Sequence, residues 1–134
     1  IERRAKKYGL PAPKTPVPYP LKNFDLANKI GLVANKEGWY LEYFRETYKV
    51  WFLKGKEAGS KQNLEETLKN LEKNLVQVLE KSQQQVIANE YNANTEEALA
   101  KGIFGAPSFS IENEIFWGDD RLEDAIEYLR ESEK

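Results

Sequence analysis

The chain has 134 residues, a formal net charge of −2 at pH 7, 40% hydrophobic and 31% charged residues, as is typical of one soluble globular domain that can bury a core. The weakly acidic balance argues against non-specific nucleic-acid binding, and no stretch approaches the roughly 18 apolar residues of a membrane span. Because Cys and His are absent, disulfides, thiol nucleophiles, imidazole bases and the usual zinc sites are excluded, and no metal site is expected.

The N-terminal part is expected to be a helix end followed by a connector. Over residues 1–9, Ala5 and Tyr8 are spaced for one helical face, and Gly9 is a suitable C-terminal stop. Five of the six prolines fall in residues 11–20, which favours an extended segment packed along a surface. The sequence begins with Ile and contains no Met, so we expect that an N-terminal part is missing.

Residues 23–54 are expected to form two helices. Asn23 can cap the first, whose apolar residues recur at helical spacing until Glu37–Gly38. The second runs from about Trp39 to Lys54 and carries seven of the sixteen aromatic residues. Because these rings cover more than one face of the helix, we expect most of them to pack in a core.

Three more helical stretches are expected before the texture changes. Asn63 to Asn70 has leucines in register, and Glu72 to about Ser82 continues helically. One long helix is then expected from about Gln83 to Lys101, although Asn94–Glu97 has the capping-box pattern of a later start.

A β-hairpin and a closing helix are expected at the C-terminal end. Ser108–Ile111 and Glu114–Trp117 alternate as strands, and Glu112-Asn113 forms the turn, where Asn113 tolerates a left-handed backbone. A last helix runs from Asp119 or Asp120 to Glu131. Two strands alone make a poor sheet, a second indication of a missing segment. The elements together predict an α/β chain that is mostly helical.

Five stretches carry a resemblance to a known family: Ile1–Pro11, Pro18-x-Pro20, Thr95–Ala98, Gly102–Ser108 and Phe116–Leu122. They are similar to motifs of the 2-hydroxychromene-2-carboxylate isomerases and their kappa-class glutathione transferase relatives, and the similarity spans essentially the whole chain. The resemblance implies the C-terminal part of a DsbA-like thioredoxin fold.

The resemblance also implies a division of the chain. Residues 1–22 would be the helix end and proline-rich connector, 23–82 a helical insertion domain, and 83–134 the C-terminal half of the thioredoxin-like domain. In the family a β-α-β unit with the catalytic Ser precedes the part that this chain matches. The resemblance therefore implies no catalytic residue within the 134 residues, and we expect no turnover from them alone.

The resemblance implies a glutathione site around the hairpin. Family members hold the proline equivalent to Pro107 in a cis peptide bond, which would let the backbone N–H and C=O of Ala106 pair with the cysteinyl backbone of glutathione. Without the resemblance, Pro107 would be read as the start of an edge strand.

Asp119 and Asp120 precede the last helix and have two interpretations. Asp120-Arg-Leu-Glu123 fits a capping box, and acidic residues there suit the helix dipole. The family implies instead that this turn binds the γ-glutamyl end of glutathione, with backbone N–H groups taking its carboxylate and Asp120 its ammonium. Asp119 replaces a Gln or Ser common in the family, and its extra negative charge does not favour the carboxylate. Arg121 is expected to be structural.

Trp51 and Phe52 are the candidates for an apolar substrate pocket. In the family the second substrate binds between the helical insertion and the thioredoxin-like core, so either ring could line a site for an aromatic substrate. Core packing is the competing interpretation, and the sequence does not choose which ring faces inward.

Three functions follow from these features. The first is a glutathione-dependent isomerase or kappa-type transferase. The second is a DsbA-like thiol–disulfide oxidoreductase with Cys-x-x-Cys in the missing segment, against which the Phe116–Arg121 motif argues. The third is a truncated, non-catalytic paralogue that self-associates through its sheet edge.

The expected partners follow from the first function. They are glutathione and a small aromatic-pathway substrate, without nucleic acid or membrane, and a homodimer is possible. The expected location is the cytoplasm, and a periplasmic location stays open because a signal peptide could have been lost with the N-terminal part.

Overall fold

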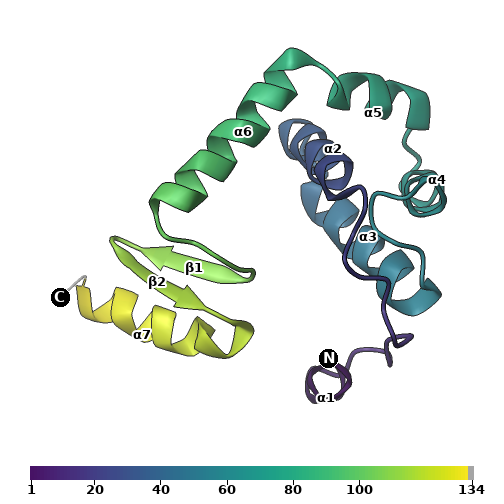
Figure 1. Cartoon of the computed structure of the whole chain (residues 1–134). Coiled ribbons are helices and arrows are strands. Elements are labelled where there is room, and N and C mark those ends of the chain that lie inside the picture. The colour runs from purple at the N-terminus through teal and green to yellow at the C-terminus, as the bar shows by residue number, and fades with distance from the viewer. Residues whose placement is uncertain (133–134) are drawn as a thin grey trace. The chain divides into compact units, whose positions relative to one another are not determined.

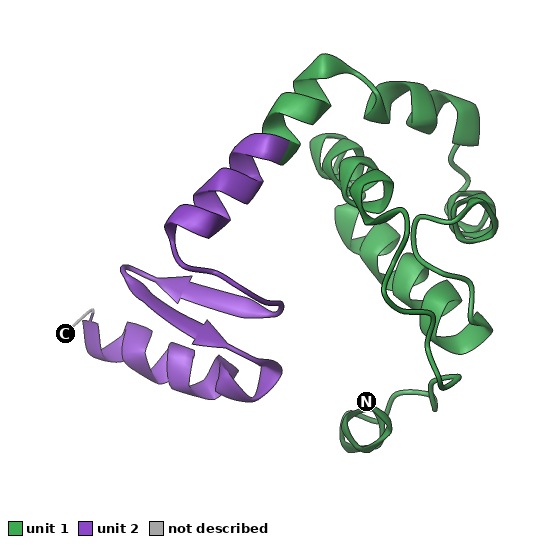
Figure 2. Cartoon of the chain, in the orientation of Figure 1, with its two compact units in different colours: residues 1–91 green, residues 92–134 purple. Residues whose placement is uncertain are grey.

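The boundary between two structural units falls inside helix α6 (Gln85–Ala100). The computed structural model describes residues 1–132. The first unit comprises Ile1–Tyr91 and the second Asn92–Lys134, as Figure 2 shows. The expected long helix at 83–101 is confirmed. The described residues include no helix with the length and apolarity needed to cross a bilayer.

Helices α1–α5 make up most of the first unit, and α2 lies against both α3 and α5 while α3 also packs on α4 (Figure 1). Their bounds are α1 Glu2–Lys7, α2 Phe24–Lys36, α3 Tyr40–Lys54, α4 Lys61–Asn70 and α5 Leu75–Ser82. The core they enclose consists of Ile30, Val33, Ala34, Trp39, Tyr43, Leu64, Leu68, Val78 and Ile87. Apolar side chains recurring at helical spacing therefore build the core, as the sequence predicts.

Two expectations about helix ends are wrong. Asn23 occupies the position before α2, but its side chain makes no capping hydrogen bond, because φ −119° and ψ 39° differ from the extended backbone of a side-chain cap. The helix expected from Glu72 does not begin there, because Glu72 has φ 55°. Asn74 instead caps α5 by accepting a hydrogen bond from the Gln77 N–H at 3.0 Å.

The proline-rich connector lies along helix α3, as expected of an extended, packed segment. The backbone N–H of Lys14 donates to the carbonyl of Phe52 at 2.6 Å. The indole N–H of Trp51 donates to the carbonyl of Pro18 at 2.9 Å. The connector thus donates one hydrogen bond to α3 and accepts one from it, as an extended segment with few internal hydrogen bonds can.

The second unit is a two-stranded antiparallel hairpin with one helix against it. Strands β1 (Ser108–Ile111) and β2 (Glu114–Trp117) pair in the register Ser108↔Trp117 to Ile111↔Glu114. A 3-10 turn, η1 (Asp119–Arg121), leads into α7 (Leu122–Ser132), which packs on the hairpin through the ring contact of Phe116 with Tyr128 at 5.7 Å.

The strand bounds agree with the sequence prediction, but two details of this unit do not. Glu112, not Asn113, has the positive φ of 52°, so the left-handed backbone lies at the first central residue of the turn. The last helix starts at Leu122 rather than at Asp119 or Asp120, because the preceding residues form the tighter 3-10 turn.

Candidate functional site

The hairpin places Pro107 beside Gly118. The N–H of Gly118 donates to the carbonyl of Pro107 at 2.9 Å, which extends the ladder one step beyond the pair Ser108↔Trp117. Ala106 precedes Pro107 and Asp119 follows Gly118, so these two residues lie just beyond the open end of the hairpin. The structure therefore brings the sequence-predicted residues at 106–107 and 119–120 to the same end of the hairpin.

Ala106 and Pro107 present an exposed backbone edge. Both residues are exposed, and the peptide bond that joins them is cis, as are the bonds at Thr15–Pro16 and Tyr19–Pro20. Within residues 1–132 no hydrogen bond occupies the N–H or C=O of Ala106. An exposed residue with a backbone donor and acceptor not bonded within the described chain can pair with the backbone of a peptide ligand.

The loop before β1 is held by one hydroxyl and one glycine. The Ser108 hydroxyl donates to the carbonyl of Gly105 at 2.6 Å. A Cβ on Gly105 would lie 2.5 Å from the indole nitrogen of Trp117, so the ring of Trp117 lies directly over this glycine. The backbone that leads into Ala106 is thus packed against β2.

Trp117 and Phe104 form an exposed aromatic pair beside this edge. Their ring centroids are 5.1 Å apart, and the side chains are 55% and 75% exposed. Sequence patterns did not single out Phe104. Gly105 is the signal that could have identified Phe104. A glycine has no Cβ, so the Trp117 indole can cover the backbone at Gly105 and meet the ring of the preceding residue.

Asp119 and Asp120 lie in the first turn after the hairpin, and both are exposed. Gly118 has φ 116°, a conformation that favours glycine. A Cβ there would lie 2.6 Å from Oδ1 of Asp120, so this carboxylate folds back over Gly118. Arg121 pairs with Asp124 at 2.7 Å on the exposed helix surface, in agreement with a structural role for Arg121.

Trp51 and Phe52 belong to the first unit. Trp51 is 8% exposed and is enclosed by the connector that accepts its indole N–H. Phe52 is half-buried and stacks on Tyr48 with a centroid distance of 5.6 Å and an interplanar angle of 5°. The structure thus gives Trp51 a packing role, while Phe52 keeps part of its surface open.

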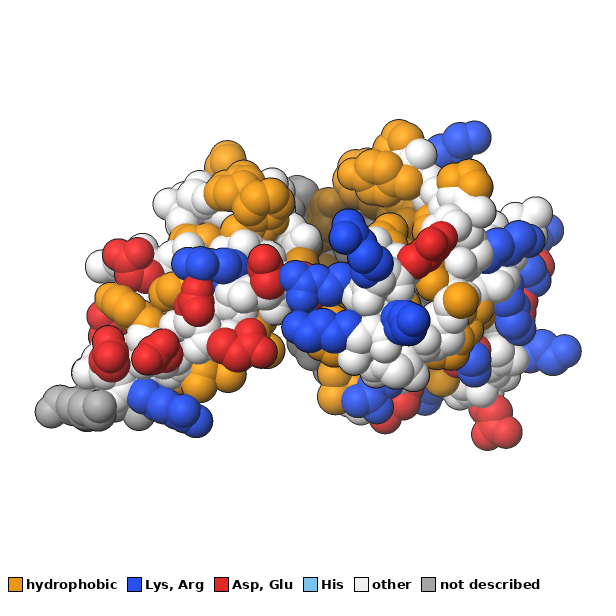
Figure 3. Space-filling model, turned by 90° about the horizontal axis from the view of Figure 1, so that it is seen from below, with side chains coloured by type: hydrophobic (Ala, Val, Ile, Leu, Met, Phe, Trp, Pro, Cys, Tyr) orange, Lys and Arg blue, Asp and Glu red, His pale blue; other side chains and the backbone are white. Residues whose placement is uncertain are grey.

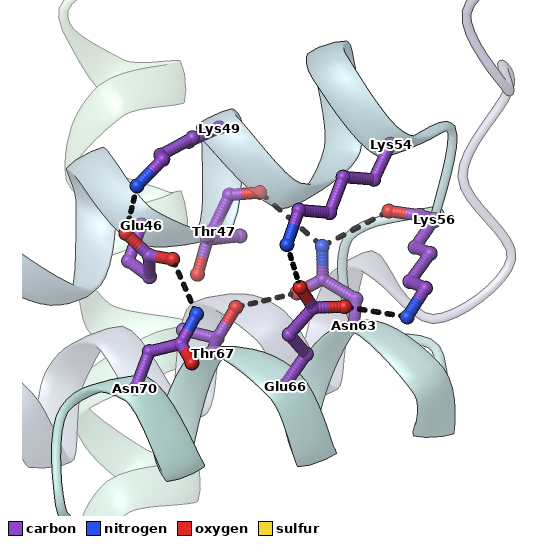
Figure 4. A network of polar contacts seen from close by, with 9 residues as sticks. All are labelled: Glu46, Thr47, Lys49, Lys54, Lys56, Asn63, Glu66, Thr67 and Asn70. Carbon is purple, nitrogen blue, oxygen red and sulfur yellow. Dashed lines mark hydrogen bonds and ion pairs between the residues drawn. The ribbon is translucent and has the colours of Figure 1, made fainter.

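A polar hollow of about 400 Å³ lies over α4 and is lined by Lys56, Gln62, Glu65, Glu66, Lys69 and Asn70. Figure 4 shows Glu66 held between Lys54 and Lys56. Hydrogen bonds from Lys54 and then Lys56 lower the pKa of Glu66 to about 2. A carboxylate that stays ionised so far below neutral pH is a poor general acid or base, which favours a structural role for this cluster.

Beneath this cluster a buried amide joins α3 to α4, as Figure 4 also shows. The Asn63 amide donates to the carbonyls of Thr47 at 3.2 Å and Lys56 at 2.9 Å, and its oxygen accepts from the Thr67 hydroxyl at 3.3 Å. Residues 1–132 hold no group of three or more acidic, His or Cys side chains that could bind a metal ion.

Comparison with known proteins places these features in context. The chain matches the family model described as a DSBA-like thioredoxin domain over residues 1–130. The curated 2-hydroxychromene-2-carboxylate isomerase of Sphingobium xenophagum is 42% identical over 40 residues, which are 30% of this chain and 20% of the relative.

A solved structure of a 2-hydroxychromene-2-carboxylate isomerase has the same fold. It superposes with a TM-score of 0.75 at 20% identity, over 98% of this chain. The chain spans 64% of the length of that structure and one fifth of the curated relative. Since the family model covers nearly the whole sequence, the chain belongs to the DsbA-like thioredoxin domain family.

Proposed function

We propose that the end of the hairpin is a glutathione-binding wall and that the protein acts as a glutathione-dependent isomerase related to the 2-hydroxychromene-2-carboxylate isomerases. The observation that carries the proposal is the hydrogen bond from Gly118 to Pro107 at 2.9 Å. It sets the exposed residue Ala106 beside the 3-10 turn that precedes α7. An extended peptide with a charged end needs both features close together.

Each part of glutathione has a chemical counterpart at this end of the hairpin. The N–H and C=O of Ala106 would pair with the cysteinyl backbone. The backbone N–H groups at 119–120 would receive the γ-glutamyl carboxylate, since the first turn of a helix directs its N–H groups outward, whereas the N–H of Arg121 donates to the carbonyl of Gly118 at 3.2 Å. Asp120 would accept hydrogen bonds from the γ-glutamyl ammonium.

The isomerase part of the proposal rests on the kinship with the isomerase of Sphingobium xenophagum and on the shared fold. Addition of the glutathione thiolate to an unsaturated substrate would make the attacked double bond single, so the bond could rotate. Expulsion of the thiolate would then restore the double bond and regenerate glutathione. These residues bind and orient the thiol, and none of them is proposed to transfer a proton.

Titration of the chain with glutathione, followed by the amide signals of residues 104–121 in NMR spectra, tests the binding. Asp120→Asn is expected to weaken binding about tenfold or more, since a hydrogen bond between two charged groups contributes about 1.5–3 kcal/mol. Glu114→Gln removes the same charge at the far end of β2 and should change the affinity less than about twofold.

Equal losses from the two variants would show a general charge effect and contradict a specific role for Asp120. Absence of any shift at millimolar glutathione would overturn the proposed site. We expect no isomerase turnover from these 134 residues with glutathione and 2-hydroxychromene-2-carboxylate; measurable turnover would show that a catalytic group has been overlooked among them.

A further inference from the structure

The charge of the chain is unevenly divided along its length. The second unit holds eleven Asp and Glu against four Lys and Arg, whereas residues 23–91 of the first unit hold ten of each kind. Residues 1–22, which we call the basic segment, hold six Lys and Arg against one acidic residue, Glu2. Figure 3 is seen from the side on which α1 lies in Figure 1, and Lys and Arg side chains gather over this part of the first unit. The net charge of −2 therefore conceals a strongly basic segment.

Helix α1 directs three cations away from the rest of its unit. Arg3, Lys6 and Lys7 are exposed and have the i, i+3, i+4 spacing of one helical face. Arg4 and Ala5, on the other side of the helix, are half-buried. Within residues 1–132 none of the three exposed cations forms an ion pair. The helix dipole favours Lys6 and Lys7 in the last turn but not Arg3 in the first, so the row of cations has no complete explanation within α1.

Contacts with the rest of the first unit hold the basic segment in place. The Glu2 carboxylate accepts a hydrogen bond from the Thr15 hydroxyl at 2.7 Å, which ties α1 to the connector. The side chain of Lys14 lies against the C-terminal end of α3, where a Cβ on Gly55 would lie 3.4 Å from its Cδ. A surface that is already held in this way loses little conformational entropy when a partner binds.

Two large and strongly exposed side chains accompany the cations. Leu10 is 60% exposed, although its N–H donates to the carbonyl of Ala5 at 2.9 Å and so closes the C-terminal end of α1. Tyr19 is 82% exposed and follows Pro18, whose carbonyl accepts the indole N–H of Trp51. Both side chains therefore project from a backbone that is held in place.

We propose that the basic segment is a docking surface for an anionic lipid membrane. The negative surface potential of such a membrane attracts the cations, and Leu and Tyr side chains bury apolar surface at its headgroup layer. A nucleic acid would also attract the cations, but its phosphates offer no apolar layer to a leucine such as Leu10. The contact is peripheral, needs no membrane-spanning helix and does not depend on the glutathione-binding wall of the second unit. It departs from the expectation of no membrane partner, which averaged the charge of two unlike units.

Co-sedimentation with lipid vesicles tests the docking, with phosphatidylcholine alone compared with a mixture of phosphatidylcholine and phosphatidylglycerol. We expect binding to the anionic vesicles only, weakened at least about fivefold when added salt shortens the Debye length from about 10 Å to about 3 Å. The double variant Lys6→Gln/Lys7→Gln should bind about ten- to thirtyfold more weakly, at about fivefold for each cation near the surface. Leu10→Ser and Tyr19→Ser should each weaken binding about three- to tenfold through lost apolar burial.

Lys61→Gln/Lys69→Gln is the matched control, because it removes the same charge from exposed positions of α4, and it should change the lipid affinity less than about twofold. Circular dichroism checks that each variant keeps its helices. No binding to the anionic vesicles, equal binding to phosphatidylcholine alone, or equal losses in the control would overturn the proposal. Binding of a single-stranded oligouridylate that Lys6→Gln/Lys7→Gln abolishes, together with vesicle binding that Leu10→Ser and Tyr19→Ser leave unchanged, would overturn it in favour of a nucleic acid.

Discussion

The two units differ in where their apolar side chains lie. The first unit has a core with Ile30, Ala34 and Leu68 fully buried. In the described part of the second unit, Ala125 is the one buried residue. Leu122, Ile126 and Leu129 of α7 are 40–42% exposed. The first unit can therefore derive stability from burial, whereas the second relies on its hairpin ladder and one helix.

This difference separates stability from recognition. The proposed glutathione wall lies in the second unit and consists of backbone groups and exposed carboxylates, whose placement depends on the hairpin register. The first unit holds the packed core, which includes Ile30, Ala34 and Leu68. Substitutions should therefore affect stability mainly in the first unit and the geometry of the wall mainly in the second.

The largest contrast is expected between two leucines. Leu68→Ala, at 0% exposure, should lower the free energy of unfolding by about 2–5 kcal/mol through lost burial and a cavity. Leu129→Ala, at 42% exposure, should lower it by about 1 kcal/mol or less. Urea unfolding monitored by circular dichroism measures both. Similar losses would contradict the proposed difference between the units.

Two glycines give the next contrast. Gly59 has φ 80°, and a Cβ there would clash with the carbonyl oxygen of Asn23, so Gly59→Ala should destabilise the first unit by about 3 kcal/mol. The nearest obstacle to a Cβ on Gly105 is the indole of Trp117, which is half-exposed and can turn away. Gly105→Ala should therefore lower the free energy of unfolding by about 1 kcal/mol or less and change the ring signals of Trp117 in NMR spectra. A larger loss of unfolding free energy in Gly105→Ala than in Gly59→Ala would contradict these packing differences.

The buried amide of the first unit gives a smaller effect. Asn63→Ala leaves the carbonyls of Thr47 and Lys56 and the hydroxyl of Thr67 without this partner, so a loss of about 1–3 kcal/mol is expected. Asn70 is exposed and bonds to Glu46 at 2.7 Å, and Asn70→Ala should change the same unfolding midpoint by no more than about 0.5 kcal/mol. Equal effects would show that the amide network adds nothing beyond surface hydrogen bonding.

The smallest effect is expected from the exposed ion pairs of Glu66. Its folded pKa of about 2 lies below the ordinary value of 4.5, so its contribution is present above pH 4.5 and is lost as the pH falls through about 2. Glu66→Gln should flatten the pH dependence of the urea midpoint in that range, and added salt should reduce the difference from wild type.

Glu65→Gln serves as the control, since Glu65 meets Lys61 only at 3.7 Å. An unchanged pH profile in Glu66→Gln would show that the two lysines do not stabilise the fold through this carboxylate.

Local patterns predicted most of the fold. The strand bounds, the two-residue turn and the helices over residues 24–54 and 85–100 agree with spacing alone, because apolar periodicity and turn residues act within a few positions. Asn23 and Glu72 show the limit of local rules. The carbonyl of Asn23 is packed against Gly59, and Glu72 adopts a left-handed backbone between two helices, so tertiary packing overrides their local preferences.

The candidate site was only partly accessible to sequence reasoning. The predicted strand bounds and turn lead to the observed closeness of positions 107 and 118, because an antiparallel register follows from a two-residue turn. The aromatic helix was harder. Phe44 and Trp51 are seven residues apart and so share a helical face, yet the connector covers Trp51 and leaves Phe44 open. That difference depends on a segment more than thirty residues away.

Hydrogen–deuterium exchange along the chain, with and without glutathione, tests the separation of stability from recognition most directly. We expect slow exchange in α2, α3 and α4, faster exchange in β1, β2 and α7, and slowing by glutathione confined to residues 104–121. Equal or greater protection of the hairpin in the free chain, or slowing by glutathione in the first unit instead, would contradict it.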